Sequence, residues 1–159
     1  MIMTDNKKKA TLHEKCVLLD DSKWARDFEW ADVQALVKYM DLLTAPKGAI
    51  IISEGKRASF LGIIVKGRVE VYKEDLVSKR RVQLAVMHAG EVLGEMSLFD
   101  GEPRSASVVA LEETDLLVLT SDQLNQLIKE NPQLAIKVLM KLGKYISRRH
   151  RMAHGKIME

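Results

Sequence analysis

The sequence predicts an α+β, mainly β protein, in which an antiparallel barrel or jelly roll lies between one N-terminal helix and two C-terminal helices. Three observations predict this fold. Apolar residues recur at helical spacing over residues 29–42, short strand-like runs follow over residues 49–119, and helical spacing returns from residue 121. The 159 residues are enough for one domain with a full-sized core.

The chain starts with a polar segment, residues 1–27, which we expect to form an arm that is partly disordered or loosely helical. After it, Val33, Leu36 and Met40 lie three or four positions apart. This spacing is typical of an amphipathic helix, here over about residues 29–42. A Pro-Lys-Gly sequence then ends the helix.

About eight short strands are expected between residues 49 and 119. β-branched runs and alternating apolar residues, separated by glycine turns, indicate strands that pair in an antiparallel barrel or jelly roll. The segments that the pattern marks are Ile50–Ile52, Phe60–Val65, Val69–Tyr72, Arg81–Met87, Ser105–Ala110 and Asp115–Leu119.

Two helices are predicted after the strands. Thr120 and Gln123 form a capping-box pattern, so the first of these helices covers about residues 121–130. An Asn-Pro pair at residues 131–132 then indicates the start of a second helix, which we expect to run to about residue 150.

The last predicted helix carries an apolar stripe formed by Leu139, Leu142 and Ile146. This spacing suits helix pairing, and the sequence leaves open whether the stripe packs on its own barrel or forms a homodimer. We expect residues 151–159 to be a C-terminal tail.

The most informative segment for function is the run from Leu93 to Ala110, LGEMSLFDGEPRSASVVA. Its arginine, Arg104, has a planar guanidinium that matches phosphate oxygens. The small residues after it expose backbone N–H groups, and Glu95 can accept a hydrogen bond from a sugar hydroxyl. These groups predict a site for a small anion that also carries hydroxyls, such as a cyclic sugar phosphate.

The run resembles the phosphate-binding cassette of the cyclic-nucleotide-binding domain family. Gly67 in VKGRVEVY and Gly90 in HAGEVLGE stand where the family has turns, and the resemblance covers roughly residues 28–150. It implies a double-stranded β-helix roll, a short helix between Glu95 and Arg104, and a regulatory domain that binds cAMP or cGMP.

By resemblance, Glu95 matches the acceptor for the ribose 2′-hydroxyl and Arg104 matches the phosphate ligand. Serine at position 105 is more typical of members that favour cAMP than of those that favour cGMP. The alternative for the acid and the arginine is an internal ion pair that shapes the loop. The ligand-binding residues that the resemblance implies are Gly94, Glu95, Met96, Ser97, Arg104, Ser105 and Ala106.

Family members normally cap the base with a residue of the last helix. In this sequence Tyr145, Arg148, Arg149 and His150 are the candidates for that contact. The alternative for the basic residues among them is a solvated helix end that suits the helix dipole.

Other classes of function have little support in the sequence. The four histidines are scattered without other metal ligands at suitable spacing, and no serine has recognisable histidine and aspartate partners. We therefore expect no enzyme activity, no metal and no cofactor. The net charge of +3 is small, and residues 150–159 are too few for a DNA-reading unit, so we expect no DNA binding.

No apolar run approaches the length of a membrane span, and Cys16 is the single cysteine, so we expect a cytoplasmic protein that binds no membrane. The leading hypothesis is a cyclic-nucleotide sensor, with cAMP as the expected ligand, that signals to an unidentified partner by repacking its C-terminal helices. The alternative is a ligand-free β-roll that acts as an interaction and dimerisation protein. An open polar cavity between the acid and the arginine would favour the sensor.

Overall fold

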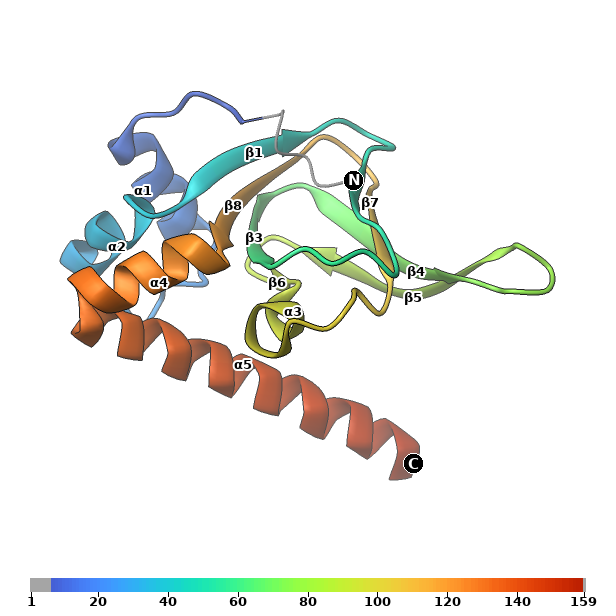
Figure 1. The fold of residues 1–159 in the computed structure, drawn as a ribbon. Coiled ribbons are helices and arrows are strands. Elements are labelled where there is room, and N and C mark those ends of the chain that lie inside the picture. Colours follow the sequence, from blue (N-terminus) through green and yellow to red (C-terminus); the bar gives the residue numbers. More distant parts are fainter. Residues whose placement is uncertain (1–6, 159) are drawn as a thin grey trace.

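The computed structural model describes residues 7–158, and its centre is a roll of two four-stranded antiparallel sheets (Figure 1). The first sheet has the strand order β1-β8-β3-β6 and the second has the order β2-β7-β4-β5. Side chains from both sheets share one apolar cluster, so the sheets pack face to face. The strands are β1 (Asp41–Ala45), β2 (Ile50–Ile52), β3 (Phe60–Lys66), β4 (Arg68–Glu74), β5 (Arg81–His88), β6 (Val92–Leu93), β7 (Ser107–Ala110) and β8 (Thr114–Thr120).

The predicted fold class is confirmed, but the roll begins earlier than residue 49. Strand β1 pairs with β8 from Asp41 opposite Val118 to Ala45 opposite Thr114. The helix predicted over residues 29–42 is correspondingly shorter, since α2 spans Trp30–Val37. The prediction overran because the apolar residues of β1 continue the helical spacing of α2.

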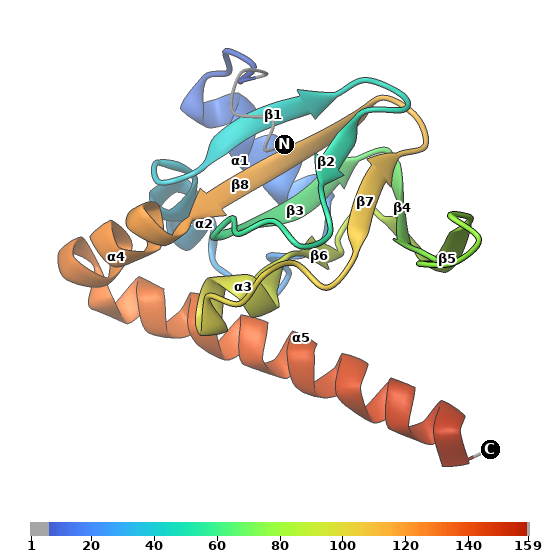
Figure 2. The same cartoon turned by 45° about the vertical axis from the view of Figure 1, so that its right-hand side comes forward.

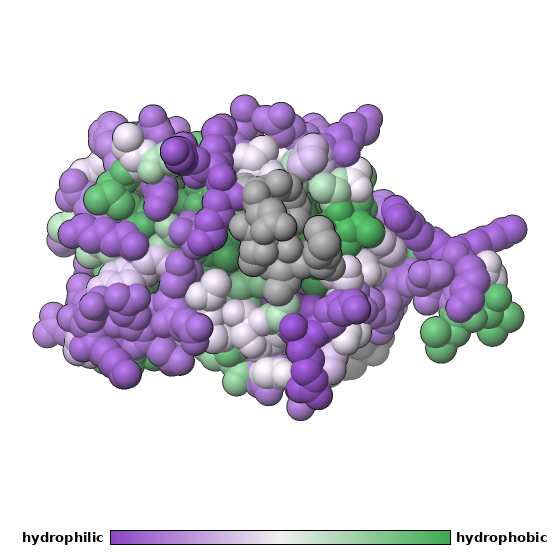
Figure 3. Space-filling model, turned by 45° about the horizontal axis from the view of Figure 1, so that its top comes forward, coloured by the Kyte–Doolittle hydropathy of each residue, from purple (hydrophilic) through white to green (hydrophobic). Residues whose placement is uncertain are grey.

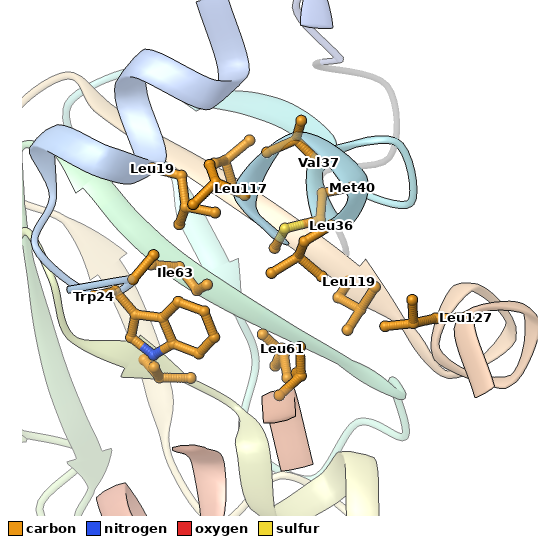
Figure 4. Packing of buried hydrophobic residues seen from close by; sticks show 14 of the residues in the cluster. Leu19, Trp24, Leu36, Val37, Met40, Leu61, Ile63, Leu117, Leu119 and Leu127 are labelled. Carbon is orange, nitrogen blue, oxygen red and sulfur yellow. The ribbon is translucent and has the colours of Figure 1, made fainter. Parts of the chain in front are cut away.

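The segment predicted as a loose arm contains a packed helix, α1 (Leu12–Asp21). Thr11 and Glu14 form a capping box at its start, and Cys16 and Leu19 are buried. Figure 4 shows Leu19 beside Leu117 of the roll. Only a few apolar residues anchor this helix, which is why its hydrophobic pattern is weak. Residues 1–6 of the predicted arm lie outside the described residues.

The two C-terminal helices are α4 (Ser121–Glu130) and α5 (Pro132–Met158). The capping box predicted for α4 is present, and Asn131 accepts a hydrogen bond from the Leu134 amide at the start of α5. Where a tail was predicted from residue 151, α5 continues to Met158, and this segment contains no proline to interrupt it. Of the apolar stripe, Leu142 is fully buried against the protein's own core and Leu139 packs beside it.

Two further features of the fold are a short helix and a projecting hairpin. The short helix α3 (Glu95–Asp100) lies between the roll and α5 in both ribbon views (Figures 1 and 2). The β4–β5 hairpin projects from the roll, with Leu76 and Val77 exposed near its tip, and Figure 3 shows apolar colour at the far end of this hairpin. Within residues 7–158, no helix combines the length and the apolar character needed to cross a bilayer.

Candidate functional site

The predicted cassette is a tight strand–helix–strand connection. Strand β6 ends at Leu93, and Gly94 follows with a φ of +74°, a conformation that favours glycine. A Cβ atom at this position would also collide with the guanidinium of Arg104. Gly101 ends α3 in the left-handed conformation, as expected for a helix C-terminus. Glycine is thus needed at position 94 both for the turn and for the close approach of the arginine.

Arg104 is held inside the cassette and is only 5% exposed. Its two terminal nitrogens donate to the carbonyl oxygens of Gly94, at 2.8 Å, and Phe60, at 2.7 Å. Its guanidinium carbon also lies 4.7 Å from the centroid of the Phe60 ring. Burial lowers the pKa of this guanidinium, and the nearby charge of Glu95 partly opposes that shift. Among the described residues, nothing accepts a hydrogen bond from its buried Nε.

A cavity of about 130 Å³ lies against the cassette. All seven ligand-binding residues implied by the resemblance line it, so the structure brings them together. Sequence reasoning missed the apolar wall of this cavity, although the inward positions of alternating strands are a signal that could have found part of it. The residues of this wall are Ile52, Val71, Met87, Val92, Leu93 and Val108.

Glu95 is 5% exposed, and its carboxylate is paired with an arginine of another element. Nη1 of Arg149, on α5, lies 3.0 Å from Oε1 of Glu95. The internal pair of Glu95 with Arg104, considered as an alternative from the sequence, is therefore not the contact that the carboxylate makes. The charge of Glu95 acts on the pKa of Arg104, and Arg104 makes its own hydrogen bonds to two backbone carbonyls.

The four candidate base contacts on α5 occupy different places. Arg149 lines the cavity, whereas Arg148 lines a separate groove on the outer side of the helix. The Tyr145 hydroxyl accepts a hydrogen bond from the Val92 amide at 3.1 Å, next to the cassette. His150 stacks on His154, with 6.4 Å between the ring centroids. Of these four candidates, Arg149 is therefore the one that lines the cavity.

Comparison with known proteins identifies the family. The family model described as "Cyclic nucleotide-binding domain" matches residues 42–131, more than half of the chain. The chain belongs to the cyclic nucleotide-binding domain family. The matched residues run from β1 to the end of α4 and include the whole cassette of this cyclic nucleotide-binding domain.

Two curated relatives are similar to this domain. The Cyclic AMP receptor protein of Thermus thermophilus is 35% identical over 104 residues, which are 65% of this chain and 48% of the relative. The cAMP-activated global transcriptional regulator CRP of Escherichia coli O157:H7 is 32% identical over 113 residues, 70% of this chain and 51% of the relative. The chain thus spans about half the length of the curated relatives it matches.

Solved structures give the same assignment. A cyclic nucleotide-binding domain from Methylobacillus flagellatus KT has a TM-score of 0.79 at 35% identity, covering 92% of this chain and 82% of that one. The Catabolite Activator Protein of Thermus thermophilus has a TM-score of 0.72 at 30% identity, covering 84% of this chain and 61% of that one. The roll, the cassette and the flanking helices therefore follow a known architecture.

Proposed function

We propose that this protein is a cyclic-nucleotide sensor, a binding module rather than an enzyme, located in the cytoplasm. The observation that carries the proposal is the cavity that Glu95 and Arg104 both line. A bulky side chain filling this space would have favoured the rival hypothesis of a ligand-free interaction protein. The buried Nε of Arg104, which lacks an acceptor among the described residues, adds a donor suited to a phosphate oxygen.

Each wall of the cavity has a part in this proposal. The cyclic phosphate accepts hydrogen bonds from Arg104 and from the backbone amides of Ser105 and Ala106, and the ribose 2′-hydroxyl donates to Glu95. The base lies along the apolar wall, where its burial from water adds to the affinity. Together these contacts select a molecule with one anionic group, a sugar hydroxyl and a flat apolar ring.

Among cyclic nucleotides we favour cAMP, with cGMP as the alternative. Ser105 lines the cavity, and serine at this position is more typical of family members that favour cAMP. The two curated relatives described above are also named for cAMP.

The proposed signal is a change in the packing of α5. Tyr145 and Arg149 join this helix to β6 and to the cassette, through Val92 and Glu95. A ligand that contacts the cassette changes the free energy of these contacts and so shifts the population of α5 positions. An unidentified downstream protein would then sense the position of the helix.

We also propose that a second copy of this chain pairs with α5. Leu142 is buried in the protein's own core, so the proposed pairing surface differs from the predicted stripe of Leu139, Leu142 and Ile146. Ile136 and Met140 are 61% and 60% exposed, and Gly143 follows them on the same face of the helix. Sedimentation equilibrium should show a dimer that Met140→Glu weakens at least tenfold, because dimerisation would bury the new charge. A monomer at all concentrations would remove the dimer from the proposal.

Calorimetric titration with cAMP, cGMP and cyclic di-GMP tests the sensor function. We expect cAMP to bind, and Arg104→Ala to weaken binding at least about tenfold because a charge-assisted phosphate contact is lost. Arg80→Ala, in the exposed hairpin, removes the same charge far from the cassette and should leave the affinity unchanged. Absence of heat with all three ligands up to about millimolar concentration would eliminate the sensor function.

A further inference from the structure

A second cavity, of about 310 Å³, lies beside the connection between β2 and β3. It shares Ile52 and Arg104 with the cassette cavity, and its other lining residues differ. Its volume is at the lower end of the range of small-molecule sites. The residues that line only this second cavity are Ile51, Ser53, Lys56, Arg57, Ala58 and Phe60.

Hydrogen bonds tie the connection between β2 and β3 to the cassette. The Gly55 amide donates to the Arg104 carbonyl at 2.8 Å, and the Arg104 amide donates to the Lys56 carbonyl at 3.0 Å. Nη1 of Arg57 donates to the carbonyl of Gly101 at 3.2 Å. Figure 2 shows this connection beside the segment that leads from α3 to β7. The residues that line the second cavity are therefore held in place by the cassette.

One wall of the second cavity is apolar. Ile51, Ile52 and Phe60 are buried members of the core cluster that the two sheets share, and Ala58 packs against this cluster. A hydrocarbon group placed against this wall would leave water without exposing any other part of the core. The wall is mostly aliphatic, so it suits an alkyl chain.

The charged groups at this cavity are all cationic. Lys56 and Arg57 are exposed, whereas Arg104 is 5% exposed, and none of the described lining residues is acidic. Burial lowers the pKa of the Arg104 guanidinium, because little water surrounds its charge. An anion nearby therefore gains more from this arginine than it would from one in water.

We propose that the second cavity is a binding site for a small aliphatic carboxylate, separate from the nucleotide site. The alkyl chain packs on the apolar wall, and the carboxylate meets the cationic groups. A carboxylate matches a guanidinium, and its single charge costs less to bring beside an apolar wall than the double charge of a phosphate monoester.

The shared arginine couples the two cavities. A carboxylate in one cavity and a cyclic phosphate in the other repel each other, and both draw on the same buried cation, Arg104. The carboxylate should therefore lower nucleotide affinity, and by linkage the nucleotide should lower carboxylate affinity by the same factor. This coupling rests on the proposed function, whereas the carboxylate site does not.

Calorimetric titration of the full chain with octanoate tests the site, and 1-octanol is the uncharged probe of the same chain length. Octanoate should bind at least about fivefold more tightly than 1-octanol, because the charged lining groups are cationic. Ala58→Phe places a ring in the cavity and should abolish octanoate binding, while cAMP affinity stays unchanged because Ala58 does not line the cassette cavity.

A matched pair of exposed lysines tests the charge. Lys56→Gln should weaken octanoate binding about twofold to fivefold, as is typical of an exposed charge. Lys47→Gln removes the same charge from an exposed position that lines neither cavity, and it should have no effect. Thermal unfolding monitors the folding of each variant, and if Ala58→Phe does not fold, this lysine pair decides.

Titration of cAMP at increasing octanoate concentrations tests the coupling. The Kd of cAMP should rise at least about threefold and then level off, because the ligands occupy separate cavities. A Kd that rises without limit would place octanoate in the cassette cavity and overturn the second site, and an unchanged Kd would overturn the coupling.

Three further results would overturn the carboxylate site: no octanoate binding, equal affinities for octanoate and 1-octanol, or octanoate binding that a folded Ala58→Phe variant retains. If octanoate binds as expected and cAMP does not bind, the proposed function fails and the carboxylate site stands.

Discussion

The two halves of α5 differ in how they meet the rest of the protein. The first half, Pro132–Leu142, buries Leu134, Ala135, Val138 and Leu142 in the core. Over residues 143–155 no side chain is fully buried, and Figure 1 shows the helix running out beyond the roll. This second half meets the cassette through polar contacts of Tyr145 and Arg149. A single helix therefore combines a hydrophobic anchor, Pro132–Leu142, with a C-terminal arm over residues 143–155 that is held to the rest of the protein by polar contacts.

The largest expected effect separates the anchor from the arm. Leu142→Ala should lower the free energy of unfolding by about 2 to 5 kcal/mol, because it leaves a cavity at a fully buried position. Met152→Ala, at a 61% exposed position of the arm, should change it by less than about 0.5 kcal/mol. Guanidinium-induced unfolding of both variants measures the difference, and similar losses would refute the division of the helix.

Sequence reasoning recovered the features that depend on neighbouring residues. The turn at Gly94, the short helix and the arginine at position 104 lie within one stretch, so the residue types in this stretch and its resemblance to a known cassette indicated a phosphate site. The capping residues of α4, Thr120 and Gln123, are likewise close together in the sequence. Strand β1 was missed because its leucines fit a helical spacing as well as a strand, and only pairing with β8 decides between them.

The partner of Glu95 could not be predicted for a different reason. Arg149 is one of several basic residues near the end of α5, and the sequence gives them similar patterns. Which of them faces the cassette depends on the rotation of the helix. The burial of Leu142 and the hydrogen bond of Tyr145 to Val92 fix that rotation, and both are tertiary contacts. The site is therefore predictable on the cassette side and depends on packing on the helix side.

A smaller effect is expected where the arm first touches the roll. Tyr145→Phe keeps the ring but removes the hydroxyl that accepts from the Val92 amide. The free energy of unfolding should fall by about 0.5 to 1.5 kcal/mol, because the Val92 amide loses a part-buried hydrogen-bond partner. Hydrogen exchange at the Val92 amide should quicken in the same variant, whereas amides in the middle of β8 should keep their protection. Unchanged exchange at Val92 would show that this contact does not hold the arm.

The smallest predicted effect concerns alkaline pH. Burial raises the pKa of the Tyr145 hydroxyl above its ordinary value of 10.0, and the hydrogen bond from Val92 only partly opposes this shift. The folded protein thus favours the neutral phenol. This contribution to stability is fully present below about pH 10 and is lost as the pH rises from there through the folded pKa, because the unfolded chain releases the proton first.

Raising the pH from about 8 to about 10.5 should therefore lower the unfolding midpoint more in the unmodified protein than in Tyr145→Phe. Tyr39, whose pKa is raised mainly by its hydrogen bond to Glu130, is present in both proteins and cancels in the comparison. Equal shifts would mean that the arm leaves Tyr145 in water, contrary to the docking of α5 described above.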